Sequence, residues 1–201
     1  MKTDLITISS TGRKMEKALE QAEKVSSYKG LSGKNALHLR LLTEEMMGMM
    51  RAITGETEGT FWIDDEDGIY KLHLVVFTRM DSEKREQLLK SSSSGKNESA
   101  RGLMGMLRDF FDRSADEDVA SFTSPMLLSG MHECSSVPEM DWEWSMVKYS
   151  DALSSLVKQN DDAAKAAWDE LEKSVVAHVA DDVKISIKGN QVEMIIYKSI
   201  K

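Results

Sequence analysis

The strongest helical pattern of apolar residues in the chain covers residues 37–53. Apolar side chains recur there every three or four positions, which is the spacing of one buried face of an amphipathic helix. A second line along the same helix contains Glu44 and Gly48. A glycine inside a helix lowers helix stability by about 1 kcal/mol relative to alanine, so Gly48 indicates a role in close packing or in leaving room for a ligand. The alternative is a core helix with an exposed glutamate and a tolerated glycine. The predicted buried stripe consists of Leu39, Leu42, Met46, Met49, Met50 and Ile53.

The remaining pattern predicts strands and helices on both sides of this central helix. β-Branched residues in short runs are typical of strands, and apolar positions at helical spacing are typical of helices. No internal repeat interrupts the order. The predicted strands are 4–10, 60–63, 69–77 and a hairpin at 183–196, and the predicted helices are 13–28, 37–53, 81–90, 100–112, 141–158 and 161–180.

Two hairpins are predicted in more detail. Residues 64–68 form an acidic loop between the strands at 60–63 and 69–77. In the second of these strands, alternation places Tyr70, Leu72, Leu74 and Val76 on the face that packs against helices, and His73 on the more open face. The final hairpin is predicted to turn at residues 189–190, which places the apolar residues of its two strands opposite each other.

Strands joined as hairpins, with the helices gathered between them, predict the fold class. The order favours an α+β two-layer sandwich, in which a mixed and mostly antiparallel sheet carries its helices on one face. With 201 residues, the chain is long enough for one substantial core, and we expect a single domain over residues 1–201.

Charge and composition narrow the function classes. The formal net charge is −8 and no basic block occurs, so a nucleic-acid partner is not expected. No apolar run approaches the ~18 residues of a membrane-spanning helix, and the N-terminus lacks the apolar core of a signal peptide. We therefore expect a cytoplasmic protein that does not act at a membrane. The single cysteine, Cys134, excludes an internal disulfide and is interpreted as an inert thiol.

The element order and two short motifs resemble a known ATP-binding fold. Residues 43–48 read Thr-Glu-Glu-Met-Met-Gly, and residues 100–105 read Ala-Arg-Gly-Leu-Met-Gly. Together they resemble the Bergerat fold shared by gyrase, histidine kinases, heat-shock chaperones and mismatch-repair ATPases. The branch that looks nearest is the bacterial anti-sigma-factor serine kinases. The resemblance covers residues 4–112 and the final hairpin, and it makes residues 114–180 a helical insertion before that hairpin.

The resemblance assigns roles to individual positions, and several are altered here. Glu44 matches the family's general base and is compatible with that role. Gly48 stands where the family has an asparagine that binds Mg²⁺, and Asp81 is a displaced substitute for the aspartate that reads adenine. The resemblance makes residues 81–99 the nucleotide lid. The glycine motif after the lid is nearly intact and can hold an anion through backbone N–H groups, and its matching residues are Arg101, Gly102, Leu103 and Gly105.

These changes favour the loss of Mg-ATP chemistry. Removing one preorganised electrostatic contact typically costs ~2.7–4 kcal/mol, and two motifs are altered. The first hypothesis is a degenerate regulatory module that has weak or lost Mg-ATP binding and acts on a protein partner. This hypothesis is compatible with a homodimer. Its candidate contact residues are Trp142, Trp144 and Tyr149, whose rings equally fit a role in docking the insertion.

Two alternatives stay open. The second hypothesis is an active, nucleotide-dependent serine kinase that uses Glu44 as base and Glu45 or Asp81 as a substitute metal ligand. The third is an unrelated α+β domain, which strand order would distinguish: the ATP-binding fold requires both hairpins in one sheet with the central helix across it. Methionines on the central helix and on the helix at 100–112 also predict a small, closed apolar pocket between them.

Overall fold

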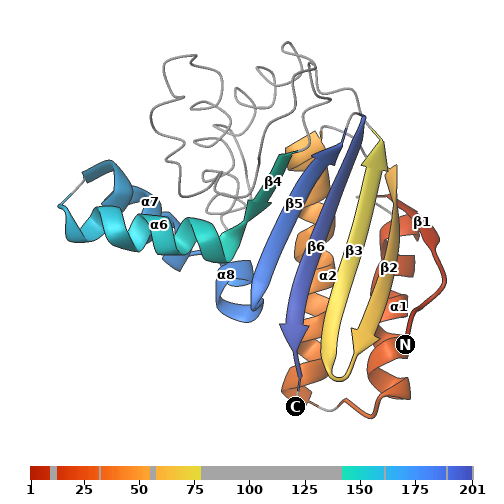
Figure 1. The fold of residues 1–201 in the computed structure, drawn as a ribbon. Coiled ribbons are helices and arrows are strands. Elements are labelled where there is room, and N and C mark those ends of the chain that lie inside the picture. Colours follow the sequence, from red (N-terminus) through yellow and green to blue (C-terminus); the bar gives the residue numbers. More distant parts are fainter. Residues whose placement is uncertain are drawn as a thin grey trace.

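The described residues form one open antiparallel sheet with helices packed against it (Figure 1). The computed structural model describes residues 1–9, 13–31, 33–54, 58–77, 142–160, 162–188 and 190–200. The six strands follow the order β1-β2-β3-β6-β5-β4, and every pairing among them is antiparallel. The strands are β1 (Ile6–Ser9), β2 (Glu58–Glu66), β3 (Ile69–Phe77), β4 (Trp142–Ser145), β5 (Asp182–Lys188) and β6 (Gln191–Ser199).

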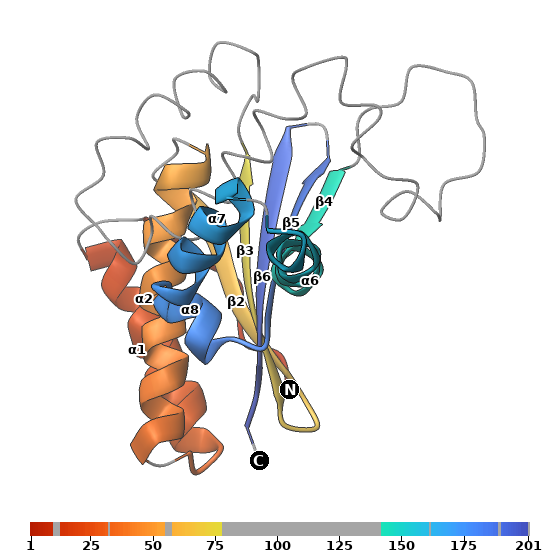
Figure 2. The same cartoon turned by 90° about the vertical axis from the view of Figure 1, so that its left-hand side faces the viewer.

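Five described helices complete the fold. Figure 2 shows α1, α2 and α8 on one face of the sheet, whereas α6 and α7 form a hairpin that extends beyond the β4 edge in Figure 1. The predicted α+β class is therefore confirmed, with a sheet that is antiparallel rather than mixed in the described strands. The helices are α1 (Arg13–Tyr28), α2 (Gly33–Thr54), α6 (Met146–Lys158), α7 (Asp162–Glu172) and α8 (Val175–Val179).

Helix α2 lies across the middle of the sheet and supplies much of the core. It packs on β3 and β6, the two central strands, as well as on α1 and α8. The apolar stripe predicted for this helix is confirmed at every position whose side chain is described, because each of these residues is almost completely buried. They are Leu39, Leu42, Met46, Met49 and Met50. No described helix is both long enough and apolar enough to cross a bilayer.

Strand β3 and the final hairpin have the predicted faces. Leu72 and Leu74 are buried against the helices, whereas His73 lies on the opposite face. In the final hairpin Val183 pairs with Ile196, and the pairing of Lys188 with Gln191 confirms a two-residue connection.

The acidic hairpin loop predicted at residues 64–68 is wrong. Strand β2 continues to Glu66, and only Asp67 and Gly68 form the turn, both with positive φ. Asp65 is buried and accepts a charged hydrogen bond from Lys29, and its Oδ1 also accepts the N–H of Gly68 at 3.1 Å. A buried carboxylate is tolerated inside a strand when it is paired in this way.

Both predictions for the segment before β5 need correction. The predicted helix at 141–158 begins as strand β4, in which Trp144 pairs with Ile185, and becomes helical only at Met146. The predicted helix at 161–180 is two helices, because the buried Ser174 caps α8 by accepting the N–H of Ala177 at 3.3 Å. Tertiary pairing and a capping serine thus override the helical spacing of the apolar residues.

Candidate functional site

Helix α2 places Glu44 and Gly48 on one exposed flank. The two positions are four residues apart, so they lie about one helical turn from each other. Both are exposed, and Leu37 on the same line is 61 % exposed. A Cβ added at Gly48 would meet no atom of the described residues within 4 Å. Packing against the described part of the chain therefore gives no reason for glycine at this position.

Glu45 lies beside this flank in a less solvated setting. Its side chain is half-buried, and burial raises the pKa of the carboxyl, with a further rise from the charge of neighbouring Glu44. A carboxyl with a raised pKa is better suited to exchange a proton near neutral pH than an ordinary glutamate. The α2 flank thus offers two adjacent carboxyl groups with different environments.

The other residues proposed from the sequence lie outside the described residues. They are the substitute for the adenine-reading aspartate, the glycine motif after the lid, and the single cysteine. The pocket predicted between the central helix and the helix at 100–112 likewise depends on the second helix and stays a prediction. The positions concerned are Asp81, Arg101, Gly102, Leu103, Gly105 and Cys134.

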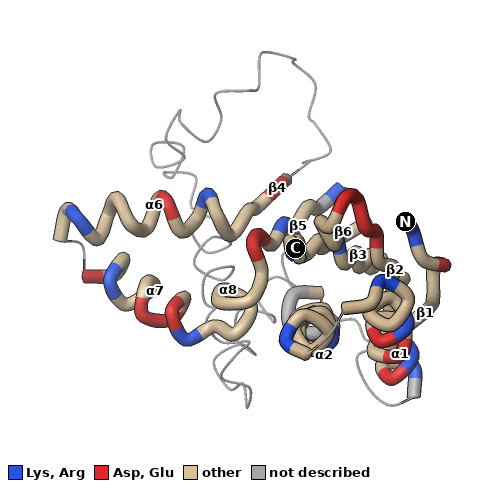
Figure 3. The backbone as a smooth tube through the Cα atoms, turned by 90° about the horizontal axis from the view of Figure 1, so that it is seen from below, with Lys and Arg blue, Asp and Glu red and all other residues tan. Residues whose placement is uncertain are grey.

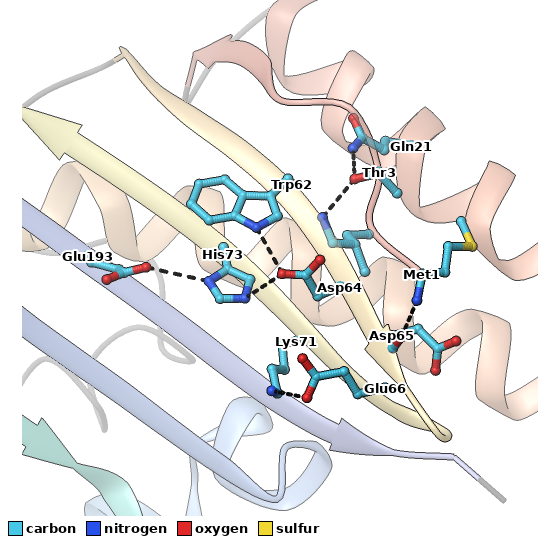
Figure 4. Close-up of polar contacts among 11 residues, drawn as sticks. Met1, Thr3, Gln21, Trp62, Asp64, Asp65, Glu66, Lys71, His73 and Glu193 are labelled. Atoms are coloured by element: carbon cyan, nitrogen blue, oxygen red, sulfur yellow. Dashed lines mark hydrogen bonds and ion pairs between the residues drawn. The ribbon is translucent and has the colours of Figure 1, made fainter.

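A second polar cluster lies on the sheet face away from α1 and α2 (Figure 4). The ring of His73 stacks on Trp62 from the neighbouring strand, with 4.6 Å between ring centroids and 6° between ring planes. Its Nε2 lies 3.3 Å from Oδ2 of Asp64, and its Nδ1 lies 3.5 Å from Oε1 of Glu193 on β6. The indole N–H of Trp62 donates to the same Oδ2 of Asp64 at 3.1 Å. Residues of three strands are thus joined through one imidazole.

The electrostatics of this cluster are balanced between burial and charge. Burial lowers the pKa of His73, and the positive charge of Lys2 lowers it further. The carboxylates of Glu193 and Asp64 oppose this shift by raising the pKa. The ammonium of Lys2 lies 5.0 Å from the Trp62 ring centroid, a distance typical of a cation–π contact. The imidazole is therefore preferentially neutral between two carboxylates, an arrangement that can take up a proton when the pH falls.

The sequence pattern does not predict this cluster, because it places Asp64 in a loop and not in strand β2. Alternation along the strand at 69–77 did place His73 on the open face, but its partners come from two other strands. The available signal was a tryptophan two positions before an aspartate, in a run that could continue as a strand. Among the described residues, no group of three or more His, Cys, Asp or Glu side chains is arranged to hold a metal ion.

The class of protein that these observations define is an α+β protein with an open antiparallel sheet crossed by one long helix. Comparison with family models, with curated proteins and with solved structures gives no match for this chain.

Proposed function

We propose that this chain is a regulatory, protein-binding module that keeps an ATP-binding-type fold with weak or lost Mg-ATP binding. The arrangement of the described strands supports this proposal. The β2–β3 hairpin and the β5–β6 hairpin lie side by side in one sheet through the β3–β6 pairing, and α2 packs across β3 and β6. Both hairpins in one sheet with the central helix across it is the arrangement expected of the resembled fold, and it supports the proposal.

The observation that carries the proposal is the exposed pair Glu44 and Gly48. The pair occupies consecutive turns of the helix that crosses the sheet, on a flank where no described atom fills the space beside Gly48. A carboxylate at position 44 can accept a proton or orient a group. Position 48 has no side-chain oxygen, so it cannot ligate the metal that neutralises the phosphate charge in phosphoryl transfer.

Calorimetric titration with Mg-ATP tests this proposal with two matched variants. Gly48→Asn supplies the missing amide oxygen, and Gly48→Ala alters the backbone propensity without supplying a ligand. Because only Gly48→Asn adds an oxygen that can ligate the metal, we expect it to bind Mg-ATP measurably more tightly than the wild type or Gly48→Ala. Micromolar binding by the wild-type chain that Gly102→Trp abolishes would refute the proposal.

One observation favours an alternative function as an active, nucleotide-dependent serine kinase. Glu44 and the half-buried Glu45 are adjacent carboxyl groups on α2, and burial raises the pKa of Glu45. In this alternative Glu44 acts as base, and Glu45 or Asp81 acts as the substitute metal ligand. Glu44→Ala should then abolish phosphotransfer to a protein serine, with Glu16→Ala on α1 as the control. Phosphotransfer that survives Glu44→Ala eliminates the alternative.

A further inference from the structure

A pocket of about 340 Å³ lies where the α6–α7 hairpin meets α8 and the residues that lead into β5. Buried apolar side chains line it, among them Met146, Leu171 and Ala180, each less than 10 % exposed. This volume falls in the lower part of the range for pockets that hold a ligand or a few side chains. The pocket is therefore large enough to receive one long side chain together with a shorter apolar neighbour.

The charged groups of the pocket are all negative. Asp151, Glu172 and Asp181 contribute to its lining, which contains no lysine or arginine. Figure 3 shows the acidic positions on α6, on α7 and just before β5 around this region. Lys198 partly neutralises Asp181, with Nζ 3.3 Å from its Oδ1. Among the described residues, no cation pairs with the carboxylate of Asp151.

The histidine of the pocket is held by a backbone carbonyl. Nδ1 of His178 lies 2.9 Å from the carbonyl oxygen of Ser174. Because a carbonyl oxygen only accepts, Nδ1 carries the hydrogen in this contact. The carboxylates of the pocket can accept hydrogen bonds from a ligand that donates several.

Trp168 supplies an aromatic wall. Its indole N–H donates to Oε1 of Glu172 at 2.8 Å, one turn further along α7, and this bond orients the ring. The ring belongs to the pocket lining and is only partly exposed. A guanidinium group can stack on an indole face while its N–H groups reach carboxylates, which an ammonium does less well.

We propose that this pocket receives an arginine of a partner protein, next to an apolar side chain on the same amphipathic helix. The proposal rests on the proposed function only in that the chain acts through protein contacts. Charge complementarity selects the arginine, and the apolar lining selects its neighbour. The α6–α7 hairpin presents both beyond the β4 edge of the sheet (Figure 1).

The test uses the full chain and a blocked helical peptide of about twelve residues with leucines on one face and arginines beside them. NMR of the ¹⁵N-labelled chain follows the Trp168 indole resonance, assigned with Trp168→Phe. We expect the arginine peptide to shift this resonance and the amides of α6, α7 and α8, whereas the same peptide with glutamates in place of arginines does not. Asp151→Asn combined with Glu172→Gln should weaken binding about tenfold or more.

A matched control is Asp169→Asn, an exposed carboxylate on α7 that does not line the pocket; it should leave the affinity unchanged. Equal binding of the glutamate peptide, unchanged affinity in the double variant, or absence of shifts at Trp168 with the arginine peptide would overturn the proposal. So would spermidine that binds as tightly as the peptide, because it would identify a site for small cations. No nucleotide enters the measurement, so its failure is distinguishable from failure of the proposed function.

Discussion

Replacing Gly48 with alanine should stabilise the protein. Gly48 lies well inside α2, more than one turn from either end, where the difference in helix propensity between glycine and alanine is about 0.8–1.0 kcal/mol. A methyl group at this position meets no described atom within 4 Å, so neither a clash nor new burial alters that difference. We therefore expect the free energy of unfolding to rise by about 1 kcal/mol.

Gly59→Ala is the matched control for this prediction. An added Cβ at Gly59 would lie 2.9 Å from the carbonyl oxygen of Val75 and 3.0 Å from Cδ1 of Leu74. The backbone oxygen cannot move without disturbing the β2–β3 pairing, so we expect a loss of about 1–3 kcal/mol. The same substitution thus has opposite expected signs at the two positions.

Urea denaturation followed by far-UV circular dichroism measures both variants. A gain of about 1 kcal/mol corresponds to a rise in Tm of roughly 2–4 °C for a chain of this size. If Gly48→Ala leaves the unfolding free energy unchanged or lowers it, the space beside Gly48 is occupied in the folded protein. The reasoning about an open flank would then be wrong.

Three further predictions concern charge and packing. Burial lowers the pKa of His73 from 6.5, so the neutral imidazole contributes stability above about pH 6.5 and this stability is lost as the pH falls through the lower pKa of the folded protein. The variant His73→Gln should therefore show a weaker dependence of unfolding free energy on pH in urea titrations at successive pH values. The hydrogen bond from Lys29 lowers the pKa of Asp65 from 3.8, so Asp65→Asn should lower stability at neutral pH and remove the decline seen when the pH falls below about 3.8; a decline that persists in this variant would contradict the assignment. Leu72 is 0 % exposed, so Leu72→Ala should cost roughly 2–5 kcal/mol by urea denaturation, whereas Ile69→Ala on the same strand, 43 % exposed, should cost little; equal losses would show that burial does not set the difference.

Elements with a regular apolar period could be predicted from the sequence, whereas elements stabilised by distant partners could not. The stripe of α2 and the alternation of β3 each repeat over many residues, so the local pattern is sufficient. The extension of β2 depends on Lys29, which neutralises Asp65 from another part of the chain. The strand at Trp144 depends on its pairing with Ile185, about forty residues later.

The candidate site shows the same division. Helical spacing alone placed Glu44 and Gly48 on one flank of the central helix, and the structure finds both exposed there. The His73 cluster combines side chains from β2, β3 and β6, and the acidic pocket combines three helices with the residues just before β5. Neither could be found without the strand order and the position of the α6–α7 hairpin, because their members are far apart in sequence.

The most direct test of the proposed function is a crystal structure of the chain grown with magnesium and a non-hydrolysable ATP analogue. We expect no triphosphate and no cation beside Gly48 at the exposed flank of α2, because position 48 offers no side-chain oxygen to the metal. Clear density for both, with the metal held near Glu44 or Glu45, would contradict the account and favour the kinase alternative.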